Sequence, residues 1–222
     1  MSLKKKIKFL HQLIFNLVIS SGISLLLLIG RIIFITDWAF NFIAWNLILA
    51  WVPLLLAYWL KFNLTKKSVY YQAAIFLLWL LFLPNAPYLI TDFIHLTTWY
   101  RVPLWYDIVL FTSFAWNGLI LGFVSLFLTE EFLKKIMTVK KAEILINFSL
   151  VLACFGIYFG RYMRHNSWDI LSQPILVAGD LANSLLDKTN LLNMAGMTFA
   201  WFLFLLGGYK LFRLLLTNKK IN

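Results

Sequence analysis

The amino-acid sequence predicts an all-α fold, a polytopic transmembrane bundle of six spans with short interfacial or re-entrant helices on its outer side. The first observation is composition, because 62% of the 222 residues are apolar and only 13% are charged. Soluble domains are about 45–50% apolar and about 25% charged, and they cannot bury so much apolar surface. The second observation is six apolar stretches, each long enough to cross about 30 Å of hydrocarbon. Together they exclude the soluble, disordered, fibrous and disulfide-rich classes.

The spans differ in how they begin and end. The first follows a lysine-rich start and runs on to Ile35, well beyond the about 7–15 apolar residues of a signal peptide, so an uncleaved span is expected. The third is short, because Pro84 and Pro87 do not normally continue a helix. The sixth is long and is expected to tilt or protrude. The predicted spans are residues 10–30, 40–60, 68–83, 104–128, 144–162 and 192–216, in a single membrane domain over residues 1–222.

The charged residues are divided unevenly between alternate connections. Fifteen of the twenty Lys and Arg residues fall in the N-terminal segment, the second and fourth connections and the C-terminal tail. By the positive-inside rule this side is cytoplasmic, so both termini are expected on the cytoplasmic side of the membrane. All six aspartates then fall on the outer side, and all three glutamates lie in one inner connection, where solvated side chains are expected. The net charge of +11 therefore indicates a bilayer, with anionic lipid as a candidate partner, and no nucleic acid.

A short amphipathic segment follows the prolines of the third span. Tyr88, Thr91, Asp92 and His95 have the spacing i, i+3, i+4, i+7 and share one helical face, while apolar residues take the other. The segment is predicted to be interfacial or re-entrant at the outer boundary. A second amphipathic segment, 175–187, is predicted to lie on the outer leaflet as a helix.

Asp92 and His95 are the candidate catalytic residues. An Asp and a His one turn apart can hold a metal or act as an oriented acid–base pair. Further metal ligands would come from Asp107, His165 or Asp169. The alternative is a hydrogen-bonded cluster that holds the segment in place. The identity of any metal or cofactor stays open.

Arg161 and Arg164 end the fifth span and are the candidate anion-binding residues. Guanidinium groups grip phosphate in a bidentate way, and lipid phosphate is the nearest source. The alternative is a structural ion pair with Asp107 or Asp92. Six further residues are assigned structural or auxiliary roles around this site: Asn85, Tyr88, Asp107, Asn166, Trp168 and Asp169.

Small and polar residues within the spans predict how the helices pack. Two glycine pairs with four-residue spacing favour close packing of the fourth and fifth spans. If these spans touch, Asp107 and Arg161 approach each other at the outer rim. Asn46 and Asn117 are expected to bond between helices rather than to contact a substrate. The glycine pairs are Gly118 with Gly122 and Gly156 with Gly160.

Four strings carry a resemblance to a known family. The chain resembles the bacterial membrane-protein family called domain of unknown function 1361 over roughly residues 40–210. The resemblance implies a multi-pass bacterial membrane protein and brings no assigned activity, cofactor or catalytic residue. The strings are NLILAWVPLLLA (46–57), LPNAPYLITDFIHL (83–96), PLWYDIVLFTSFAWNGLILGFVSL (103–126) and GIYFGRYMRHNSWDI (156–170).

Three functions are compatible with the sequence, and whether the protein is an enzyme stays open. The first is an outward-facing polar site that binds or processes a phosphate-bearing lipid or envelope precursor. The second is a small transporter for a neutral substrate, with a path that reaches Asn46 and Asn117. The third is a non-catalytic subunit that docks on a membrane complex through its glycine-lined spans.

Overall fold

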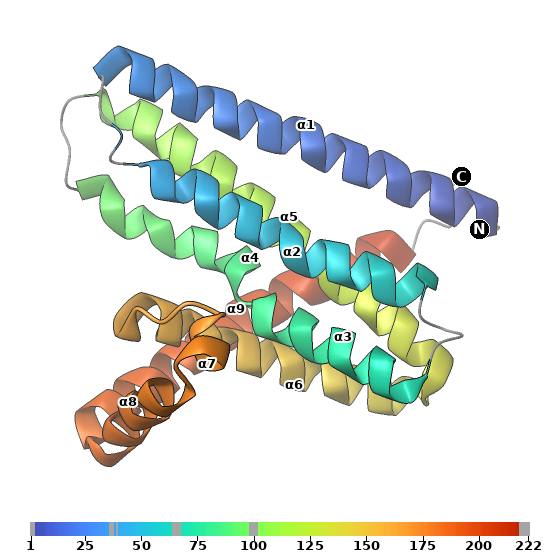
Figure 1. The fold of residues 1–222 in the computed structure, drawn as a ribbon. Helices are drawn as coiled ribbons and strands as arrows, with labels where there is room; N and C mark the ends of the chain where they lie inside the picture. Colours follow the sequence, from blue (N-terminus) through green and yellow to red (C-terminus); the bar gives the residue numbers. More distant parts are fainter. Residues whose placement is uncertain (1–2, 36–37, 39, 64–67, 98–101, 218–222) are drawn as a thin grey trace.

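The structure is a computed structural model that describes residues 3–35, 38, 40–63, 68–97 and 102–217. These residues form helices and no strands (Figure 1). The elements in chain order are α1 (Leu3–Ile35), α2 (Asn41–Asn63), α3 (Val69–Phe82), α4 (Asn85–Tyr88), the 3-10 helix η1 (Leu89–Thr97), α5 (Leu104–Ile136), α6 (Val139–Tyr158), the π-helix η2 (Phe159–Met163), α7 (Asp169–Ser172), α8 (Pro174–Leu186) and α9 (Lys188–Thr217).

Six helical segments of the described chain are long and apolar enough to cross a membrane, as the sequence predicts. The protein is therefore a multi-pass membrane protein. The start of α1 and the end of α9 lie at the same end of the bundle (Figure 1), which six alternating spans require. The spans are Lys8–Phe34, Asn41–Phe62, Val69–Leu96, Leu104–Ile136, Val139–Met163 and Lys188–Thr217.

The third span is longer than predicted, because α4 and η1 continue it to Leu96. Figure 1 shows these short helices extending onward from α3. Pro84 is the N-cap of α4 and Pro87 lies in its first turn. Backbone N–H groups in a first helical turn have no intrahelical partner, so prolines there remove no hydrogen bond. The two prolines therefore divide the span without ending it.

Helix α5 is the centre of the bundle. It contacts α1, α2, α4, η1, α6 and α9, and most of its apolar residues are buried. In contrast, α1 exposes large side chains along its length, such as Phe15, Leu26 and Phe34. In a membrane protein such side chains face lipid, where apolar exposure has no hydration cost.

The glycine pairs have a different partner from the predicted one. A Cβ atom on Gly118 would clash with the carbonyl oxygen of Ala86, and one on Gly156 would lie 2.5 Å from Cγ of Pro84. Gly122 and Gly160 likewise face this segment. The glycines thus let α5 and α6 hold the 84–89 segment, rather than fitting the two helices against each other.

Asp107 also has a different partner. It lies in the first turn of α5, but its Oδ1 accepts a 2.7 Å hydrogen bond from Nε of Arg31. Both side chains are buried, and the Arg31 guanidinium lies 3.8 Å from the ring centroid of Phe40. The predicted approach of Asp107 to Arg161 is wrong, because α1 packs on α5 at this end and supplies the arginine.

Two other polar groups join helices inside the bundle. Asn117 donates a 3.0 Å hydrogen bond to Ser24 of α1, which confirms its predicted packing role. At the other end of α5, Glu130 is buried rather than solvated. It accepts a hydrogen bond from Tyr209 and pairs with Lys134 and Arg213, which ties α9 to α5.

Candidate functional site

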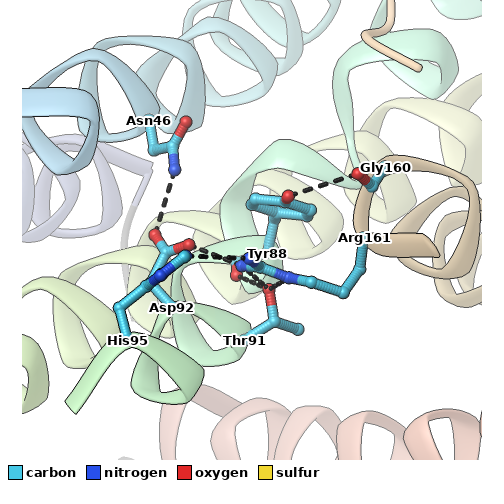
Figure 2. Close-up of polar contacts among 7 residues, drawn as sticks. All are labelled: Asn46, Tyr88, Thr91, Asp92, His95, Gly160 and Arg161. Atoms are coloured by element: carbon cyan, nitrogen blue, oxygen red, sulfur yellow. Dashed lines mark hydrogen bonds and ion pairs between the residues drawn. The ribbon is translucent and has the colours of Figure 1, made fainter. Parts of the chain in front are cut away.

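The 3-10 geometry of η1 sets up the polar site. Side chains three residues apart are aligned along a 3-10 helix. Asp92 and His95 therefore form one aligned pair, and Tyr88 and Thr91 form another at the start of the helix. The hydroxyl of Thr91 donates a 2.7 Å hydrogen bond to the carbonyl oxygen of Tyr88. The two pairs therefore lie on neighbouring faces of the helix rather than on one, yet all four side chains contact Arg161 (Figure 2).

Arg161 reaches this face from η2 and makes most of the contacts that hold the site together (Figure 2). Its Nη2 lies 2.5 Å from Oδ1 of Asp92 and 2.5 Å from Oγ1 of Thr91. Its Nε donates to the same hydroxyl at 3.0 Å, and its Nη1 lies 3.3 Å from Nε2 of His95. The sequence left two roles open for Arg161, phosphate binding or a structural ion pair. The ion pair with Asp92 is present.

Asn46 and Tyr88 complete the polar cluster. Nδ2 of Asn46 donates to Oδ2 of Asp92 at 3.0 Å, so each carboxylate oxygen has a partner. The ring of Tyr88 lies 4.6 Å from the guanidinium carbon of Arg161, in a cation–π contact. The predicted interhelical bond of Asn46 is therefore present, between α2 and η1, but a lone asparagine in a span does not reveal that its partner is a carboxylate.

Arg164 does not join Arg161. The α-helix widens to a π-helix at Phe159, and Arg164 ends it in the left-handed region at φ 57°. The i, i+3 register of an α-helix is lost, so the two side chains do not share a face. Arg164 is exposed and is not among the cavity-lining residues. Of the two candidate anion-binding residues, only Arg161 therefore lies at the cavity.

The polar cluster lies in the wall of a cavity of about 790 Å³. Asn46, Tyr88, Asp92, His95 and Arg161 line one part of it. Leucine and phenylalanine side chains of α3 and α6 line another part, and the lining continues onto α8. The cavity thus offers a polar wall and an apolar wall to one ligand. The apolar residues include Leu77, Leu80, Leu81, Leu152, Phe155, Val177 and Leu181.

Hydrogen bonds also attach α8 and the segment after η2 to the site. Nδ2 of Asn85 donates to Oγ of Ser167 at 2.9 Å, which ties α4 to the segment after η2. Nε2 of His165 lies 2.8 Å from Oδ2 of Asp180 on α8. These contacts place α8, the predicted amphipathic helix, against the cavity. Its only buried apolar residue, Val177, lines that cavity.

The remaining candidates divide into two groups. Asn85, Tyr88 and Asn166 line the cavity with Asp92, His95 and Arg161. Asp169 accepts a 2.6 Å hydrogen bond from the backbone N–H of Asn166, and Trp168 is the N-cap of α7. Neither of these two residues is among the lining residues, and neither is Asp107.

The geometry does not favour the metal hypothesis. Within the described residues, no group of three or more His, Cys, Asp or Glu side chains is placed to hold a metal. Asp107 is paired with Arg31, and His165 with Asp180. The position beside Asp92 and His95 is taken by the guanidinium of Arg161, whose positive charge opposes a cation there.

A protein-family model matches most of the chain. The family model described as "Protein of unknown function (DUF1361)" covers residues 45–205, which include the cavity-lining residues apart from Phe42. No curated protein and no solved structure matches the chain.

Proposed function

We propose that this chain, which belongs to the DUF1361 family, binds an amphipathic, lipid-like molecule in the cavity between α3, α6 and η1. The observation that carries the proposal is the two-sided lining of one cavity. The polar part of the ligand would meet the wall around His95 and Arg161, and its hydrocarbon would lie against α3 and α6. The volume of about 790 Å³ is within the range of small-molecule sites.

The apolar wall supports a ligand that enters from the bilayer. Leu77 lines the cavity and is 62% exposed. An exposed leucine in a transmembrane helix would face hydrocarbon, which supports an opening of the cavity toward the lipid chains. A lipid-like molecule would then have a route into the site that does not pass through water.

The polar wall supports recognition of a head group. Asp92 is held by Arg161 and Asn46, so we assign it a positioning role. His95 lies at the cavity surface and is the candidate for acid–base chemistry on a bound head group. The charge bias of the connections would place this wall on the extracytoplasmic side, and the basic cytoplasmic end would face anionic lipid.

The alternatives are supported less well. The transporter hypothesis requires a path that reaches both Asn46 and Asn117. The cavity reaches Asn46, but Asn117 is buried and bonded to Ser24. A subunit that docks through its glycine pairs would need surfaces that the 84–89 segment already occupies. Binding in the cavity requires neither a second path nor a partner.

The test is the lipid content of the purified protein. Native mass spectrometry from mild detergent should show a bound lipid on the wild type. The Leu152→Trp variant should lose this lipid, because the indole would fill the apolar part of the cavity. The matched control is Phe148→Trp, one turn earlier on α6 at a residue that is 56% exposed and is not among the lining residues. Loss in both variants or in neither would contradict the proposal.

A further inference from the structure

We infer that the ligand of this cavity carries an uncharged, hydroxyl-bearing head group, of the kind that a diacylglycerol or a glycosylated diacylglycerol presents. The inference rests on the proposed function and narrows the class of lipid. It departs from the expectation of a phosphate-bearing lipid, in which Arg161 would hold the phosphate. The observations behind it are the charge and the hydrogen-bond partners of the polar wall.

The guanidinium of Arg161, the cationic group of the polar wall, is already paired with the carboxylate of Asp92. All three guanidinium nitrogens of Arg161 have protein partners, and Asp92 provides the negative one at 2.5 Å. The side chain of Arg161 is 14% exposed, and the side chain of Asp92 is 1% exposed. The ring of Tyr88 covers one face of the guanidinium. A phosphate could not pair with this arginine in a bidentate way without displacing Asp92 or Thr91.

Displacing Asp92 is unfavourable for an anionic ligand. The carboxylate would stay buried, with the amide of Asn46 as its remaining partner, and a buried charge that loses its partner is strongly destabilising. The phosphate would also lie beside this carboxylate, and like charges repel strongly where water is excluded. An uncharged head group incurs neither penalty.

The rest of the lining adds no positive charge that could offset this cost. Among the described residues that line the cavity, Arg161 is the only lysine or arginine and Asp92 the only acidic residue. The charges of this pair cancel. Of the two histidines in the wall, His165 contacts the carboxylate of Asp180 on α8, while His95 faces Arg161.

Neutral hydrogen-bonding groups make up the remaining polar lining. Amides and hydroxyls both donate and accept hydrogen bonds, which matches the dual character of a ligand hydroxyl. Such a match discriminates well, because a ligand without the hydroxyl leaves the polar groups of the site unpaired. The neutral groups are Asn46, Asn85, Tyr88, Asn166 and Ser167.

The experiment compares two photoactivatable lipids that have identical diazirine-bearing acyl chains, a diacylglycerol and a phosphatidic acid. Each is crosslinked to the full-length protein in detergent, and the crosslinks are mapped by mass spectrometry. Diacylglycerol should label the apolar wall around Leu152 and Phe155, and unlabelled phosphatidic acid should compete at least about tenfold less well than unlabelled diacylglycerol. Equal or better competition by phosphatidic acid would overturn the inference and leave the proposed function standing. Labelling of the cavity by neither probe would overturn both.

A charge variant tests the cause of this selectivity. Asp92→Asn removes the counter-ion of Arg161, so phosphatidic acid should gain at least about tenfold in competition. Asp187→Asn is the control, since that carboxylate lies outside the cavity lining and accepts hydrogen bonds from the backbone N–H groups of Thr189 and Asn190, so the ratio should stay unchanged. An unchanged ratio in Asp92→Asn, with normal diacylglycerol labelling, would contradict the charge argument. If Asp92→Asn does not fold, the comparison of the two lipids on the wild type still decides the inference.

Discussion

Nη2 of Arg161 lies 2.5 Å from Oδ1 of Asp92, and this ion pair joins two segments that are 69 residues apart in the chain. It fixes the π-helix at the end of the fifth span against the 3-10 helix at the end of the third. Both irregular helices lie at the cavity, where their geometry places the polar side chains. The pair thus links the fold of this end of the bundle to the composition of the polar wall.

Loss of Arg161 should destabilise the protein more than loss of Arg164. Arg161→Met leaves the buried Asp92 carboxylate without its cation, and the free energy of unfolding should fall by about 3–5 kcal/mol. Arg164 is exposed, so Arg164→Met should change it by no more than about 0.5 kcal/mol. Thermal unfolding in detergent measures both. Equal effects would show that the Arg161–Asp92 pair does not hold the two segments together.

The second buried ion pair should behave as a unit. Arg31→Met alone should lower the free energy of unfolding by about 3–5 kcal/mol, because it leaves Asp107 charged and buried. The double variant Arg31→Met with Asp107→Leu removes both charges and should recover most of this loss. A double-mutant cycle gives the coupling energy. Strictly additive losses would contradict the pairing.

The contact of α5 with α4 predicts a glycine effect that depends on position. Gly118→Ala places a methyl group against the backbone of Ala86 and should cost about 1–3 kcal/mol through overpacking. Gly207→Ala on α9 is the control, because a Cβ there meets nothing within 4 Å. That variant should be neutral or up to about 1 kcal/mol more stable. The unfolding temperatures of the two variants are measured in the same detergent. A lower unfolding temperature in Gly207→Ala alone would contradict the close contact of Gly118 with Ala86.

The six-span architecture could be predicted from the sequence because each span carries its own apolar signal. Partners were harder to predict, since they depend on which helices are neighbours. Asp107 has an arginine partner, but it is Arg31 on α1 rather than Arg161. The glycine spacing correctly indicates close approach, yet it does not reveal that the approaching segment is 84–89.

The candidate site could be predicted in part. The i, i+3 spacing places Asp92 and His95 on one face in either an α-helix or a 3-10 helix, so that prediction did not depend on helix type. The pairing of the two arginines did depend on an α-helix, and the π-helix before Arg164 removes it. Asn46 could not be assigned to the site, because its carboxylate partner is 46 residues away.

The sidedness of the site is a prediction that cysteine labelling can test. The single cysteine, Cys154, is buried, so Cys154→Ala provides the background. Arg164→Cys should react with a membrane-impermeant maleimide on intact cells, because the charge bias puts it outside. Lys140→Cys, at the other end of the fifth span, should react only after lysis. The reverse pattern would place the polar wall on the cytoplasmic side.

An experimental structure in lipid nanodiscs tests the central claim most directly. The account predicts a continuous elongated density between α3 and α6 that ends within hydrogen-bond distance of the polar wall at His95. A cavity that holds only water, or that closes so that Leu77 and Leu152 touch, would contradict it.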